Sequence, residues 1–167
     1  MEQLIARNIV AVVTALAIII VVGLGFVIRS AANSASQAQD LVTIVQGVQK
    51  AFSNQNYQYG NGTIPSSILI NGNKIDPNIV SGTTIQTRWQ ATITLTGTGS
   101  AFSATVPSVP YGNCPDILQD QSLGQYITSI GVSGGTMRTP PVAPATAVAD
   151  CGSSGTVDVV VNFQGHP

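Results

Sequence analysis

Residues 9–28 read IVAVVTALAIIIVVGLGFVI, a run of 20 residues without a charged side chain. A helix rises about 1.5 Å per residue, so this run would extend about 30 Å, the thickness of the hydrocarbon core of a bilayer. Arg7 precedes the run and Arg29 follows it. The run predicts a membrane-spanning helix. It is too long for the apolar part of a cleaved signal peptide, and we expect it to remain in the mature protein.

Helical spacing continues beyond this run. Residues 31–52 contain no proline, and their apolar residues recur every three or four positions. The predicted apolar face comprises Ala32, Ala35, Ala38, Leu41, Val42, Val45, Val48 and Phe52. The predicted polar face comprises Asn33, Ser36, Gln37, Gln39, Asp40, Thr43, Gln46, Gln49 and Lys50. The pattern predicts one helix of about 50 residues, apolar in its first half and lying along a globular domain in its second.

The composition excludes several classes of function. Charged residues make up 8% of the 167 residues and the net charge is −1, so no basic stripe is available to neutralise the phosphates of a nucleic acid. Motifs such as GxSxG, HExxH and the P-loop are absent, and His166 is the only histidine. We therefore expect no catalytic site, no cofactor and no metal site.

The two cysteines, Cys114 and Cys151, predict a disulfide. The membrane-spanning run would place the rest of the chain outside the cytosol, where paired cysteines are oxidised. A metal site is the weaker interpretation, because it would need further cysteine or histidine ligands.

Alternating apolar and polar residues predict strands in the second half of the chain. Residues 83–89 and 90–96 alternate, and a glycine turn at 97–100 would connect 90–96 to a second strand at 101–106. Residues 155–165 are apolar almost throughout, which predicts a strand inside the sheet.

The connections are read from turn-forming residues. Residues 53–66 contain Asn, Gly and Pro and should end the long helix, and residues 67–80 suggest an irregular connection with one short helical turn. Asn113 marks the start of a helix as its N-cap. Residues 139–150, TPPVAPATAVAD, are expected to form a surface loop.

Three side chains invite a functional interpretation that the sequence does not favour. Trp89, the only tryptophan, is expected to pack against the core and not to bind a ligand. Asp116 and Asp120 are four residues apart, which would place both carboxylates on one helical face. They have neither a partner histidine nor the spacing of a calcium loop, so we expect a solvated face.

Glu2 and Arg7 have two interpretations. Glu2 can interact with the helix dipole at the N-terminus, or it can pair with the N-terminal amine or Arg7 of a neighbouring subunit.

Gly23 and Gly25 inside the apolar run also have two interpretations. They allow close packing between helices, or they mark a weak point where the helix stretches or melts.

The order of these segments resembles type IV pilins of the type IVb class, and within it the PilS-type major pilins of thin conjugative and adherence pili. The residues that carry the resemblance are MEQLIARNIVAVV at 1–13, TRWQATITLT at 87–96, VPSVPYGNCPDIL at 106–118 and ADCGSSGTVDVVVNF at 149–163. The layout agrees over the whole chain.

The resemblance implies an α+β fold, in which a long N-terminal helix packs on a C-terminal antiparallel β-sheet head with a disulfide-bracketed region. Residues 1–30 would be the filament-core and transmembrane segment, and residues 31–167 the globular head. Within the head, residues 31–54 would be the amphipathic half of the helix and residues 55–167 the β-sheet domain.

The resemblance also implies a function. Such a subunit is cleaved by a prepilin peptidase, is often methylated at the new N-terminus (here Met1), and waits in the inner membrane of a Gram-negative bacterium. Assembly machinery then polymerises it into an extracellular pilus that contacts a host or recipient cell. Met1 could equally be the initiator. The alternative is a minor pilin or pseudopilin whose head binds a surface or a cargo.

One position departs from the family pattern. Most type IV pilins have a glutamate at mature position five, where this chain has Ile5. Either Glu2 takes the docking role, or Arg7 provides a different pairing, or the filament forms without this ion pair.

Overall fold

The computed structural model describes residues 37–163, of which residues 37–52 form a helix. A short 3-10 turn, η1 (Ser53–Gln55), ends this helix. The apolar residues that the helix buries are Ala38, Leu41, Ile44, Val45, Val48 and Phe52. The apolar face is therefore confirmed over the described part of the helix, with Ile44 added to it. The predicted polar face is wrong at Gln37 and Asp40, which are both buried.

A five-stranded antiparallel sheet is the larger of the two sheets within residues 37–163. Its strands are β1 (Gly60–Ile64), β4 (Thr94–Gly99), β5 (Phe102–Pro110), β6 (Ile127–Val132) and β7 (Thr156–Phe163). The spatial order is β1-β4-β5-β7-β6, and each neighbouring pair is antiparallel. β7 pairs on both sides, which confirms the prediction that the terminal strand lies inside the sheet.

The predicted hairpin is present as β4 and β5, but the predicted turn at 97–100 is wrong over residues 97–99, which belong to β4. Thr94 pairs with Thr105 and Gly97 with Phe102, and the buried residues alternate along both strands. Leu95 of β4 and the residues Phe102, Ala104 and Val106 of β5 face the core, as the alternation predicted.

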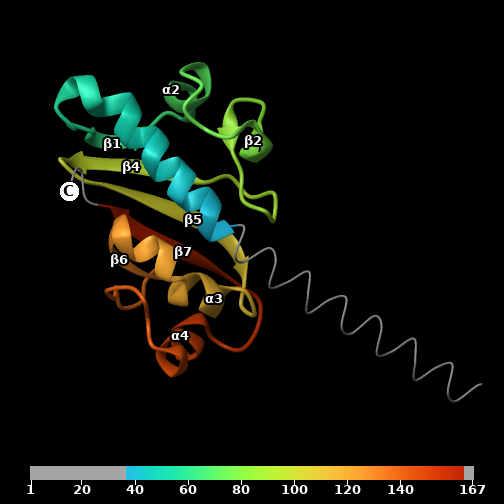
Figure 1. Cartoon of the computed structure of the whole chain (residues 1–167). Coiled ribbons are helices and arrows are strands. Elements are labelled where there is room, and N and C mark those ends of the chain that lie inside the picture. The colour runs from blue at the N-terminus through green and yellow to red at the C-terminus, as the bar shows by residue number, and fades with distance from the viewer. Residues whose placement is uncertain (1–36, 164–167) are drawn as a thin grey trace, which may run out of the picture. The chain divides into compact units, whose positions relative to one another are not determined.

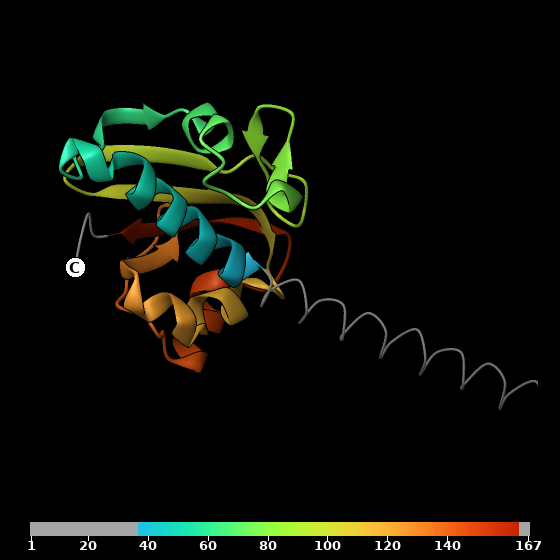
Figure 2. The same ribbon diagram turned by 45° about the horizontal axis from the view of Figure 1, so that its top comes forward.

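The helix over residues 37–52 lies across one face of the sheet (Figures 1 and 2). On one side of it lie α2 (Ser66–Asn71) and β2 (Val80–Ser81), and on the other lie α3 (Cys114–Gln119), α4 (Pro144–Cys151) and β6. One continuous apolar cluster joins the helix, the sheet and these smaller elements.

The segment between β1 and β4 includes residues 67–80, where an irregular connection with one short helical turn was predicted, and it has more regular structure than that. It contains α2, the 3-10 turn η2 (Pro77–Ile79) and a two-stranded sheet of β2 and β3 (Thr84–Ile85). The predicted strand at 83–89 is wrong beyond Ile85. A bridge between Gln86 and Thr92 is followed by a tight turn and not by a longer strand. Trp89 in this turn is half-buried against the core, as expected.

The sequence missed β1. Its residues, GNGTI, are exposed except for Ile64 and look like a turn by composition. The strand forms because β4 supplies a complete partner, from the pair of Gly60 with Gly99 to that of Ile64 with Leu95. Gly97 makes this possible, since a Cβ there would overlap the backbone carbonyl of Tyr59.

The predicted surface loop at 139–150 is also wrong, because residues from Pro144 onward form α4. Proline is tolerated in the first turn of a helix, where its missing N–H is not needed. The alanines that follow favour helix, and burial of Ala147 and Cys151, four residues apart, fixes the side that packs inward.

α3 begins after Asn113, as predicted, although the Asn113 side chain makes no capping hydrogen bond to the helix. The common helical face expected for Asp116 and Asp120 is not formed, because α3 ends at Gln119. Asp120 instead caps the 3-10 turn η3 (Gln121–Gln125) by accepting from the backbone N–H of Ser122.

Within residues 37–163, no helix is both long enough and apolar enough to cross a bilayer. The apolar run at 9–28, and with it the predicted membrane-spanning helix, lies outside these residues. Met1, Glu2, Arg7, Gly23 and Gly25 lie outside them as well.

Candidate functional site

The beginning of the described helix is joined to a distant turn by an ion pair between Asp40 and Arg88. Nε of Arg88 donates to Oδ2 of Asp40 at 2.6 Å, and a terminal guanidinium nitrogen donates to Oδ1 at 2.8 Å. The Asp40 side chain is 9% exposed and that of Arg88 is 37% exposed. This two-bond geometry permits one orientation of the guanidinium against the carboxylate.

Gln37 adds a second connection one helical turn earlier. Its side-chain oxygen accepts from the backbone N–H of Arg88 at 3.0 Å. Gln37 is fully buried, and its amide nitrogen has no hydrogen-bond partner among residues 37–163. Gln37, Asp40 and Arg88 are called the helix clamp below.

Burial is the largest influence on the pKa of Asp40, and hydrogen bonding is the largest influence on that of Arg88. Desolvation raises the pKa of Asp40 above its ordinary value, although the hydrogen bonds and charge of Arg88 act in the opposite direction. Asp76 raises the pKa of Asp40 further by repulsion. The hydrogen bonds to Asp40 raise the pKa of Arg88, so this guanidinium remains charged.

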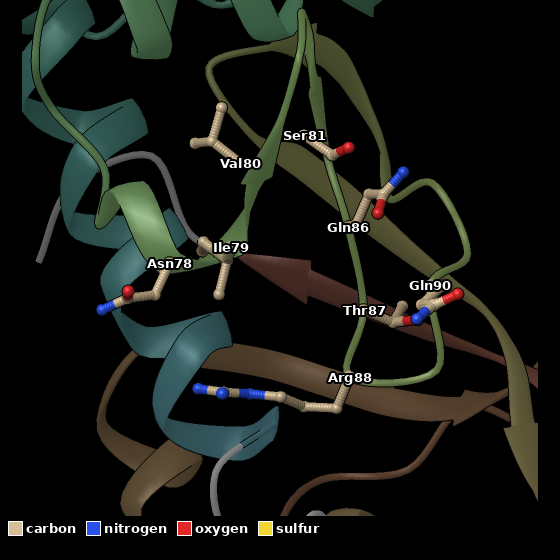
Figure 3. A pocket seen from close by; sticks show the side chains of 8 residues that line it. All are labelled: Asn78, Ile79, Val80, Ser81, Gln86, Thr87, Arg88 and Gln90. Carbon is tan, nitrogen blue, oxygen red and sulfur yellow. The ribbon is translucent and has the colours of Figure 1, made fainter.

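The turn at residues 87–91 presents Arg88 to the helix. The backbone N–H of Thr87 donates to the carbonyl of Ala91, and the Thr87 hydroxyl accepts from the N–H groups of Trp89 and Ala91 at 3.2 and 3.0 Å. Gln90 adopts a left-handed conformation that closes the turn. As Figure 3 shows, the Arg88 side chain extends from this turn toward the helix.

A hollow of about 220 Å³ lies beside the helix clamp. Its lining residues, drawn in Figure 3, are Asn78, Ile79, Val80, Ser81, Gln86, Thr87, Arg88 and Gln90. Arg88 is the only charged group in the lining, and Asp40 already neutralises it. Nowhere in residues 37–163 do three His, Cys, Asp or Glu side chains gather to hold a metal ion.

The second candidate surface is the bracketed region, residues 114–151. Cys114 of α3 and Cys151 of α4 form the predicted disulfide, with their Cα atoms 5.8 Å apart. Arg138 forms a two-bond ion pair with Asp150 at 2.6 and 3.1 Å. Hydrogen bonds from Arg138 lower the pKa of Asp150, and Asp150 raises that of Arg138.

Of the residue pairs named from sequence that lie within residues 37–163, the structure brings together the two cysteines and not the two carboxylates of Asp116 and Asp120 on one helical face. The helix clamp was missed, because Gln37 and Asp40 were assigned to a solvated face. A signal was present in the spacing. Gln37 lies four residues before Leu41 and Asp40 lies four residues before Ile44, so both continue the apolar stripe with polar side chains.

The fold can be compared with solved structures. A type IVb pilin from Salmonella typhi superposes with a TM-score of 0.52 at 20% identity, covering 75% of this chain and 98% of the pilin. TcpA, a type IV pilin from the Vibrio cholerae El Tor biotype, superposes with a TM-score of 0.56 at 12% identity. The match covers 79% of this chain and 99% of TcpA. A search of curated proteins finds no match.

The fold is thus that of a type IVb pilin, a class of structural subunits and not of enzymes. Residues 31–163 match the family model described as PilS N terminal, and the chain belongs to this family of pilins. The resemblance inferred from the sequence, the α+β fold and the assignment as a pilus structural subunit are all confirmed.

Proposed function

We propose that this chain is the major subunit of a type IVb pilus used for attachment or for conjugative mating contact. The match of residues 31–163 to the PilS family carries the proposal. Other copies of the same chain are its main partners, and the assembled pilus is extracellular. No feature of the head favours the alternative of a minor pilin with a cargo-binding site.

The apolar run at 9–28 supplies the physical reason to polymerise. Outside a membrane, this run must be buried against something apolar, and apolar burial stabilises by about 25 cal/mol per Å². Packing it among identical copies meets this requirement. A contact between two different surfaces of identical subunits, repeated without closure, produces a helical fibre.

The division of the chain follows from this assembly. Residues 1–30 would anchor the subunit in the inner membrane and later form the filament core, whereas residues 31–167 would form the outward-facing head. A prepilin peptidase would expose Met1, and the assembly machinery would draw the subunit from the membrane. The head would meet the host or recipient cell.

The first test is electron microscopy and mass spectrometry of material sheared from cells that express the full chain. We expect thin filaments made almost wholly of this chain, with Met1 as the N-terminal residue and a mass two hydrogen atoms below that of the reduced protein. Filaments that contain the chain only at trace level would instead establish a minor pilin. An absence of filaments would contradict the proposal.

A second test concerns subunit docking. If Glu2 replaces the usual docking glutamate, Glu2→Gln should reduce filament yield strongly while the amount of membrane-bound subunit stays the same. Arg7→Gln should have the same effect only if Arg7 is the partner. Unchanged filaments in both variants would show that assembly does not need this ion pair.

The double variant Gly23→Ala with Gly25→Ala tests a separate point, which is whether assembly requires a weak point in the N-terminal helix.

A further inference from the structure

The helix clamp places polar groups where the fold could use apolar ones. The residues that follow along the same buried face, Leu41, Val45 and Val48, are all apolar. Asp40 instead places a carboxylate in the interior, and Gln37 buries an amide nitrogen that finds no hydrogen-bond partner in the described part of the chain. Each such group lowers stability relative to a well-packed apolar residue.

Stability is therefore a poor explanation for the helix clamp. Replacing a buried ion pair with apolar side chains of similar volume is often neutral or stabilising. Unlike an apolar contact, this ion pair enforces a single geometry, because its two parallel hydrogen bonds set both the direction and the distance of the partners. Apolar packing also restrains the helix, through the fit of side-chain shapes, but it includes no directional bond between two particular atoms.

A second point on the helix is fixed by close packing. Gly47 lies against the backbone of Lys74, and a Cβ at position 47 would overlap the Lys74 carbonyl oxygen. Asp40 and Gly47 are seven residues apart, or about 10 Å along a helix. Two fixed points at this separation determine the direction of the helix axis relative to the head, and the ion pair determines the rotation about that axis.

We infer that Gln37, Asp40 and Arg88 are positioning residues for assembly: they set the angle and rotation at which the polymerising helix leaves the head. The inference rests on the proposed function. The sequence predicts that the helix extends back to residue 9. Over about 28 residues of helix, a tilt of about 10° at the clamp would move the far end by about 7 Å. That shift is comparable to the spacing between packed helices.

The test replaces the ion pair with apolar residues in the full chain, as Asp40→Leu with Arg88→Met. The matched control is Arg138→Met with Asp150→Leu, which removes the other two-bond ion pair of the head. For both variants, the midpoint of urea unfolding and the oxidation of Cys114 and Cys151 report folding. Filament yield and the helical rise and twist, measured by cryo-electron microscopy, report assembly.

We expect the clamp variant to fold with an unfolding midpoint equal to or above that of the unchanged chain. Its filaments should nevertheless be lost, or should show a changed or variable twist. The control variant should form filaments with unchanged rise and twist. Arg88→Lys provides a milder version, since lysine keeps the charge but lacks the planar fork of arginine. It should preserve folding and broaden the distribution of twist.

The outcomes separate the two proposals. If the unchanged chain forms filaments and the clamp variant forms the same filaments with the same rise and twist, the positioning role is wrong while the pilin function stands. If the unchanged chain forms no filaments, the proposed function fails first. If Asp40→Leu with Arg88→Met does not fold, Arg88→Lys decides the inference through its twist alone.

Discussion

The helix clamp and the bracketed region both contain an arginine–aspartate pair with two hydrogen bonds, yet the two pairs differ in what they join and in their surroundings. Asp40 and Arg88 are 48 residues apart and join the helix to the turn at 87–91. Arg138 and Asp150 are 12 residues apart and lie within one segment, which Cys114 and Cys151 also close.

The pKa shifts of the two carboxylates have opposite directions. Burial dominates at Asp40 and raises its pKa, whereas the hydrogen bonds from Arg138 dominate at Asp150 and lower its pKa. Similar hydrogen-bond geometry therefore does not mean a similar energetic role. The bracketed region gains its order from a covalent bond and a partly exposed pair, while the helix clamp orders two distant segments at a cost in desolvation.

The largest expected effect comes from the covalent bond. Cys114→Ser with Cys151→Ser opens a loop with a sequence separation of 37, and we expect unfolding free energy to fall by about 4 kcal/mol. Urea denaturation of both proteins measures this loss. Hydrogen exchange should locate the loss of protection in α3 and α4 first. Equal loss of protection at the helix clamp would contradict the separation of the two regions.

Removal of each arginine tests the two ion pairs directly. Arg88→Ala leaves the buried Asp40 carboxylate without its partner, and we expect a loss of about 2–3 kcal/mol in unfolding free energy. Arg138→Ala should cost less, because Asp150 is more exposed and water can replace the arginine. Denaturation under identical salt conditions compares them. A larger loss in Arg138→Ala would reverse the proposed difference.

Gly47 tests the packing contact that accompanies the helix clamp. Gly47→Ala should favour the helix by about 1 kcal/mol, but overlap with the Lys74 carbonyl opposes this gain. We expect a net loss of about 1–2 kcal/mol in thermal or urea denaturation. Gly112→Ala is the control, since a Cβ there meets no neighbouring atom. A gain in stability for Gly47→Ala would show that the helix does not need this close approach.

The smallest effect concerns pH. The pKa of Asp40 is raised above 3.8 in the folded head, so on acidification Asp40 takes up its proton in the folded head at a higher pH than in the unfolded chain. The contribution of Asp40 to the unfolding free energy therefore increases as pH falls. The pKa of Asp150 is lowered, so its contribution is present above its ordinary pKa and is lost as pH falls through the folded value.

The corresponding measurement is unfolding free energy between about pH 7 and about pH 3 for three proteins. Relative to the unchanged chain, Asp40→Asn should lose more stability on acidification and Asp150→Asn should lose less. Parallel curves for all three would mean that neither carboxylate has a shifted pKa.

Sequence reasoning succeeded where a pattern is local. The amphipathic helix, the alternation in β4 and β5, the interior position of β7 and the cysteine pair all followed from residue spacing or composition. It failed where a distant partner decides the outcome. β1 depends on β4, and α4 depends on burial of Ala147 and Cys151. The helix clamp was missed for the same reason, since no sequence pattern near Asp40 predicts that Arg88 is its partner.

The sequence by itself indicated the class of this protein through its resemblance to type IVb pilins, which rests on the order of an apolar run, an amphipathic continuation and two late cysteines. Only the tertiary structure decided which polar residues are buried and with what partner. Hydrophobic periodicity reports which face of an element turns inward, but a buried charge is tolerated only when a specific partner reaches it. That partner, Arg88, lies 48 residues away from Asp40 along the chain.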